Sequence, residues 1–163
     1  MNLRIEIRYA VLISLLMLLW LSLEFMIGLH DTFIDYHPYV TMLALIIPVV
    51  CSRLALTAKK EELNNKLTFK QAFATGFLTS LFAAILSIPV QLTFHFLINP
   101  DFFDNMIANS VKHAELMKMD VAQAKLQAQQ YFSLNSYIVM SFFGTLIFGT
   151  IISFVMARIM RTE

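Results

Sequence analysis

Four long apolar runs constrain what this chain can fold into. Charged residues make up only 14% of the sequence and hydrophobic ones 58%, which is outside the range of soluble globular chains. A helix rises about 1.5 Å per residue and the hydrocarbon core of a bilayer is about 30 Å thick, so runs of about 20 apolar residues can cross it. We predict an all-α membrane protein, one domain over residues 1–163, with transmembrane helices at about 9–29, 39–58, 72–98 and 134–157.

The basic residues beside these spans predict their direction. Three lie on one side, in the segment between spans three and four: Lys112, Lys118 and Lys125. Nine lie on the other side: Arg4, Arg8, Arg53, Lys59, Lys60, Lys66, Lys70, Arg158 and Arg161. Because short cytoplasmic segments carry the excess of Lys and Arg, we expect both the N-terminus and the C-terminus to be cytoplasmic.

The segment at 99–133 has the pattern of a helix outside the membrane. Asn99 is a good N-cap, Pro100 suits the first helical position, and Asp101 and Asp104 favour a helix N-terminus. Most of the apolar side chains that follow fall on one face. We predict a long amphipathic outer helix over about 100–131. It is either a surface for a partner or lipid, or a connector that covers the outer end of the bundle.

Three polar residues lie at similar depth near the outer ends of spans one and three. They are Glu24, Gln91 and His95, and the last two are four residues apart, hence on one helix face. Ionisable groups inside a membrane are costly and often functional. We expect a cluster of all three, which either holds helices together by hydrogen bonds or forms a proton-linked binding site.

The loop between spans one and two carries residue types that can bind a divalent metal ion. These are His30, Asp31, Asp35 and His37. Their spacing matches no defined metal motif, and loops at a membrane interface are often polar. We therefore assign no metal site and expect no cofactor.

Spans three and four each carry a small residue at every fourth position. The two series are Ala72, Gly76, Ser80 and Ala84, and Ser141, Thr145, Gly149, Ser153 and Ala157. Small residues at this interval let helix backbones approach closely in lipid. The two series either pack these spans against each other or form the contact surface of a homo-oligomer.

Several short motifs together resemble a known family. They include the Leu23-Glu24 pair, Gly28-x-His30, His37, the stretch from Leu67 to Phe73, and Asn99-Pro100-Asp101-Phe102. Over nearly its whole length the chain is similar to the bacterial membrane proteins grouped as domain of unknown function 4199. The resemblance implies a bacterial cytoplasmic-membrane protein with four spans and a long outer segment between the third and fourth. It implies no activity, and this chain has Asn65 and Lys66 where the family often has a glycine.

The sequence favours a non-catalytic function. It contains no G-x-S-x-G, H-E-x-x-H, P-loop or dinucleotide-binding motif, and its net charge of +1 gives no basic surface for nucleic acid. We expect an accessory or interaction subunit that contacts the lipid bilayer and a membrane-protein partner or a second copy of itself. The alternative is a small transporter or permeation component that uses Glu24.

Overall fold

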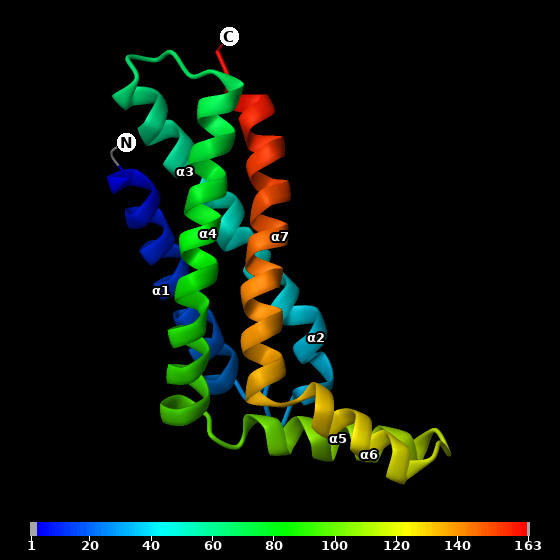
Figure 1. Cartoon of the computed structure of the whole chain (residues 1–163). Helices are drawn as coiled ribbons and strands as arrows, with labels where there is room; N and C mark the ends of the chain where they lie inside the picture. The colour runs from blue at the N-terminus through cyan, green and yellow to red at the C-terminus, as the bar shows by residue number, and fades with distance from the viewer. Residues whose placement is uncertain (1–2, 163) are drawn as a thin grey trace.

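The computed structural model describes residues 3–162, and every regular element in that range is a helix (Figure 1). In chain order the elements are α1 (Arg4–Met26), η1 (Ile34–Tyr36), α2 (His37–Val40), η2 (Thr41–Leu45), α3 (Ile46–Glu62), α4 (Phe69–Thr93), η3 (Phe94–Ile98), α5 (Phe102–Leu116), α6 (Val121–Tyr131) and α7 (Leu134–Met160). The short elements η1 and η2 are 3-10 helices, and η3 is one turn of π-helix.

Four helical stretches are long and apolar enough to cross a membrane. They are Arg4–Met26, Ile34–Glu62, Phe69–Ile98 and Leu134–Met160. This confirms the prediction of an all-helical chain with four such helices. The boundaries differ most at the starts of the first two stretches, which begin at Arg4 and Ile34 rather than near positions 9 and 39.

The four stretches run side by side and define two ends of the bundle (Figure 1). The start of α1, the turn between α3 and α4, and the last turn of α7 lie at one end, which we call the terminal end. There Leu67 and Thr162 are joined by two hydrogen bonds of 2.8 Å, one from each backbone N–H. The α5–α6 hairpin and the loop after α1 lie at the opposite end, which we call the hairpin end.

Helix α4 packs against all three other spanning stretches, most extensively against α7. The small-residue series of these two helices face each other. A Cβ atom added to Gly76 would lie 2.7 Å from the Cβ of Ser153, and one added to Gly149 would collide with the side chain of Ser80. Both serine hydroxyls bond to carbonyls of their own helices, so no polar group is left unpaired at the contact.

The remaining members of the two series differ in burial. Ala72, Ala84 and Ala157 are fully buried, whereas Thr145 is half-buried. The structure thus places the buried small residues between α4 and α7 within one chain. Because the close approach occurs there, the series supplies internal packing, and an oligomer contact is not needed to bury it.

The segment predicted as one long outer helix is two helices, which corrects that expectation. Helix α5 ends in a Schellman motif, in which the N–H of Met119 bonds to the carbonyl of Ala114 at 2.9 Å and Lys118 has a φ of +55°. Asp120 then caps α6 by accepting a hydrogen bond from the N–H of Gln123 at 3.1 Å. The chain therefore reverses between 117 and 120 and forms a hairpin.

The start of this hairpin also differs from the prediction. Helix α5 begins at Phe102, and its N-cap residue is Asp101, whose side chain makes no capping hydrogen bond. Asn99 does not cap the helix. Its side chain is buried and bonds instead to His30.

The contact between α4 and α7 predicts different effects for two glycines of the same helix. We expect Gly149→Ala to lower the free energy of unfolding by about 1–3 kcal/mol, because the new methyl group forces the two helices apart. Gly144→Ala is the matched control, since a Cβ there meets nothing within 4 Å. Thermal unfolding of the purified protein in detergent measures both. Equal melting temperatures for the two variants would contradict the contact.

Candidate functional site

The structure separates the three predicted polar residues into two groups at the hairpin end. Gln91 and His95 are joined, because the Nε2 of His95 lies 2.9 Å from the Oε1 of Gln91. The Nε2 of Gln91 also donates to the hydroxyl of Ser141 at 2.7 Å, which links α4 to α7. Glu24 bonds elsewhere: its Oε1 accepts a 2.6 Å hydrogen bond from the indole N–H of Trp20 on its own helix.

The second group consists of Glu24, His30 and His37. The Oε2 of Glu24 lies 3.4 Å from the Nε2 of His30 and 3.7 Å from the Nε2 of His37. Glu24 and His30 are buried, and the side chain of His37 is 14% exposed. Among residues 3–162, these three form a group of potential metal ligands whose donor atoms all lie within 4.8 Å of one another. We call them the Glu-His-His group.

A tight turn after α1 brings the first histidine back over the carboxylate. The N–H of Leu29 bonds to the carbonyl of Glu24 at 2.9 Å, and Gly28 has a φ of +81°, the pattern of a Schellman motif. A left-handed φ favours glycine, so Gly28 is the residue that permits this turn. The second histidine is the first residue of α2 and is followed by Pro38, which suits the start of a helix.

Residues from the segment 99–105 hold His30 in place. The side-chain amide of Asn99 lies 3.1 Å from the Nδ1 of His30, and the amide of Asn105 donates to the backbone carbonyl of His30 at 3.0 Å. The rings of Phe94 and Phe102 meet the imidazole edge-on, with centroids 5.5 and 4.9 Å away. The buried imidazole of His30 thus lies between aromatic rings and side-chain amides.

A cavity of about 690 Å³ lies between the two polar groups. His37, Gln91 and His95 all line it. Most of its remaining wall is apolar and aromatic, from residues such as Met106 and Tyr137. The cavity therefore gives the two groups a common space at the hairpin end, although they share no hydrogen bond.

The two aspartates of the predicted loop do not join the histidines. Asp31 accepts a hydrogen bond from the N–H of Thr32. Asp35 bonds to Asn109 at 3.2 Å and to the Nε2 of His113 at 2.9 Å, both on α5. Asp35 thus ties the loop to the hairpin, at the exposed edge of the cavity.

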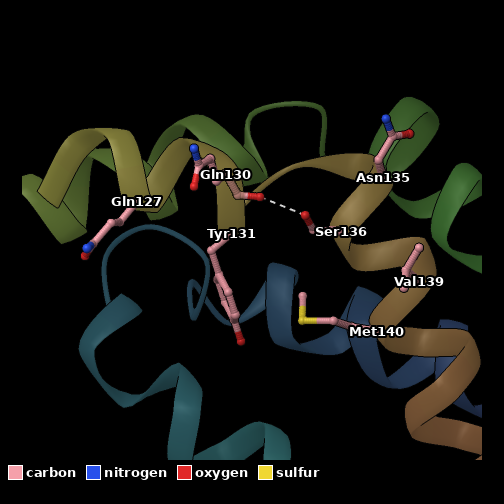
Figure 2. A pocket seen from close by; sticks show the side chains of 7 residues that line it. All are labelled: Gln127, Gln130, Tyr131, Asn135, Ser136, Val139 and Met140. Atoms are coloured by element: carbon pink, nitrogen blue, oxygen red, sulfur yellow. Dashed lines mark hydrogen bonds between the residues drawn. The ribbon is translucent and has the colours of Figure 1, made fainter. Parts of the chain in front are cut away.

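A second hollow, of about 650 Å³, lies at the corner between α6 and α7 (Figure 2). Tyr131 and Met140 line both this hollow and the larger cavity. The hydroxyl of Ser136 donates a 2.7 Å hydrogen bond to the backbone carbonyl of Gln130, drawn as the dashed line in Figure 2. This bond fixes the angle between the hairpin and α7.

A further buried carboxylate was missed from the sequence. Glu6, near the terminal end of α1, is 2% exposed, accepts a 3.2 Å hydrogen bond from the hydroxyl of Thr75, and lies 3.9 Å from the Nζ of Lys59. Glu6 precedes the first apolar run, a position at which a charged side chain is expected to be exposed to solvent. The feature of the sequence that could have predicted its burial is the opposite charge of Lys59, at the same end of span two.

These features define the chain as an all-helical protein with four helices suited to a membrane and a buried histidine–carboxylate group at one end. Its sequence matches, over residues 8–162, the family described as protein of unknown function (DUF4199). The chain therefore belongs to that family, which confirms the resemblance drawn from the short motifs. No curated protein and no solved structure matches it.

The separation of the two polar groups can be tested by double-mutant cycles. We expect Gln91→Leu to lower the free energy of unfolding by about 1–3 kcal/mol, since it leaves Ser141 and His95 without their partner. Its effect should add to that of Glu24→Gln but not to that of Ser141→Ala, because only the latter pair is bonded. Thermal unfolding in detergent provides the measurement. Strong coupling between positions 24 and 91 would contradict the separation and support the single cluster predicted from the sequence.

Proposed function

We propose that this chain is a non-catalytic accessory subunit of the bacterial cytoplasmic membrane. In this proposal both ends of the chain are cytoplasmic, and the α5–α6 hairpin lies on the outer side. The hairpin docks on another integral membrane protein. The observation that carries the proposal is the exposed apolar surface at the tip of the hairpin.

The distribution of charge along the bundle supports this orientation. The nine basic residues counted beside the spans belong to segments of the terminal end, whereas Lys112, Lys118 and Lys125 belong to the hairpin (Figure 1). An excess of Lys and Arg marks the cytoplasmic side of a membrane protein. The hairpin, with three, therefore faces outward.

Exposed apolar side chains near the tip of the hairpin favour a protein partner. Leu116, Met117 and Met119 are 71%, 69% and 60% exposed, and Leu126 on α6 is 61% exposed. Figure 1 shows the hairpin extending sideways past α7, so its tip lies beside the bundle rather than over it. Apolar residues held outside the spans in this way are stabilised when another protein covers them.

The hairpin is also held firmly enough to present a fixed surface. Asn105 and Asn109 connect α5 to the loop after α1, and Ser133 caps α7 by accepting a hydrogen bond from the N–H of Ser136. A rigid element loses little conformational entropy when it binds. The hairpin is thus prepared for docking.

Transport through Glu24 has less support. Glu24 lies near the hairpin end of α1 and Glu6 near the terminal end, and 18 residues of helix separate them by about 27 Å. Between them Ala10, Ile13 and Cys51 pack together with Ala83. Ser14 bonds to the carbonyl of its own helix at Ala10. A proton or ion pathway along α1 would have to cross this apolar cluster.

The orientation can be tested with reporter fusions. We expect alkaline phosphatase fused after Glu163 to be inactive, since the enzyme folds only on the outer side, and the same reporter inserted at Lys118 to be active. Activity in bacterial cells expressing the fusions is the measurement. Activity at the C-terminus would reverse the proposed orientation.

The docking surface can be tested by crosslinking in cells. A photoreactive amino acid at Met119 should give a product with a different membrane protein, identified by mass spectrometry. The double variant Leu116→Asp and Leu126→Asp should remove that product, because charges replace the apolar contact. The matched control is Gln129→Asp, an exposed polar position on α6.

The identity of the crosslinked product shows which molecule covers the tip of the hairpin. A product of two copies of this chain would replace the proposed partner by a homo-oligomer. Crosslinks to lipid alone would assign the tip to the membrane surface. Retention of the protein product in the double aspartate variant would show that the apolar tip is not the docking surface.

A further inference from the structure

We propose that the Glu-His-His group binds one divalent transition-metal ion, with Zn²⁺ as its best representative. The three ligands would be the Oε2 of Glu24 and the Nε2 atoms of His30 and His37. The inference does not depend on the docking of the hairpin, because all three residues precede α3 and none belongs to the hairpin.

The distances suit such an ion. In a tetrahedral zinc site with bonds of about 2.0–2.1 Å, neighbouring ligand atoms are about 3.3 Å apart. The carboxylate oxygen lies 3.4 Å from one imidazole nitrogen and 3.7 Å from the other. All three ligand atoms lie within 4.8 Å of one another, so the two imidazoles would move toward each other to close the site around an ion.

Two of the three ligand atoms have no hydrogen-bond partner. The Oε2 of Glu24 and the Nε2 of His30 make no hydrogen bond, and both belong to side chains that are at least 98% buried. A buried polar atom without a partner is destabilising. The two atoms face each other, so a single ion between them would satisfy both.

The surrounding residues orient the ligands as metal sites require. Trp20 holds the other oxygen of Glu24. The amide of Asn99 lies against the Nδ1 of His30, and rotation of this amide by 180° would present its oxygen to an Nδ1–H. That tautomer leaves the lone pair of Nε2 free for the metal, the arrangement typical of histidine ligands.

The third ligand provides access. His37 is 14% exposed and lines the cavity of about 690 Å³, whose rim includes the exposed residues Asp35 and His113. An ion can enter through this cavity and meet His37 first. The side of the site toward the cavity remains open for a fourth ligand, which water can supply.

The donor set selects the class of ion. Two imidazole nitrogens and one carboxylate oxygen suit Zn²⁺ and related ions of the first transition series. Mg²⁺ and Ca²⁺ prefer oxygen ligands, and Cu⁺ prefers sulfur. A bound ion would join the end of α1 to the start of α2 across the turn at Gly28.

Direct titration tests the site. Protein purified in detergent and treated with a chelator should bind one Zn²⁺ per chain in isothermal titration calorimetry. We expect His37→Gln and Glu24→Gln each to weaken binding by about tenfold or more. The matched control is His113→Gln, which removes an exposed histidine at the rim of the same cavity and should leave the affinity unchanged.

An optical readout locates the ion independently. Trp20 is the single tryptophan of the chain and bonds to Glu24, so Co²⁺ bound at the site should quench its fluorescence, and Zn²⁺ should displace Co²⁺ and restore it. This quenching should be lost in His37→Gln. His37 is partly exposed, so this variant carries the test even if Glu24→Gln fails to fold.

Three results would overturn the proposal. The first is no saturable Zn²⁺ binding by the parent protein, which would leave Glu24 and the histidines as a direct ion pair. The second is binding that survives His37→Gln, and the third is binding that His113→Gln abolishes. The second result would exclude His37 as a ligand, and the third would place the ion at the exposed rim of the cavity.

Discussion

The close approach of α4 and α7 is the contact on which the rest of the structure depends. In lipid, apolar side chains gain little from leaving their surroundings, so backbones must come near enough for dispersion forces to hold them. Glycine opposite serine permits this at Gly76 and Gly149. Because α4 also packs against α1 and α3, and α7 leads directly from the hairpin, this one contact fixes where both ends of the bundle lie.

Polar side chains inside such a bundle must find partners within the chain, since neither lipid nor water supplies them. The two groups at the hairpin end solve this differently. The amide nitrogen of Gln91 bonds to Ser141 and its amide oxygen bonds to His95. Gln91 therefore holds α4 and α7 together. The Glu-His-His group leaves two buried atoms facing each other without a hydrogen bond. The Glu-His-His group therefore keeps buried donor atoms that the proposed metal ion would satisfy.

The sequence predicted features that repeat at a regular interval, such as helices and their faces. It predicted much less about which way each helix faces its neighbours and where the chain turns. Apolar runs located four spans, and the four-residue spacing of Gln91 and His95 placed them correctly on one face. Depth alone suggested that Glu24 joins them, but depth does not say which way α1 faces, and Glu24 turns toward His30. The break in the outer helix was hidden because Lys118, rather than glycine, adopts the left-handed conformation there.

The two buried carboxylates of α1 bear on how the protein is made. Helix α1 is synthesised before α3 and α4, yet Glu6 finds its partners in Lys59 and Thr75 on those later helices. Glu24 depends on histidines that follow at positions 30 and 37 of the same chain. The contacts of Glu6 at the terminal end are therefore complete only when both α3 and α4 pack beside α1. The folding of this end of α1 thus depends on segments of the chain that are synthesised after it.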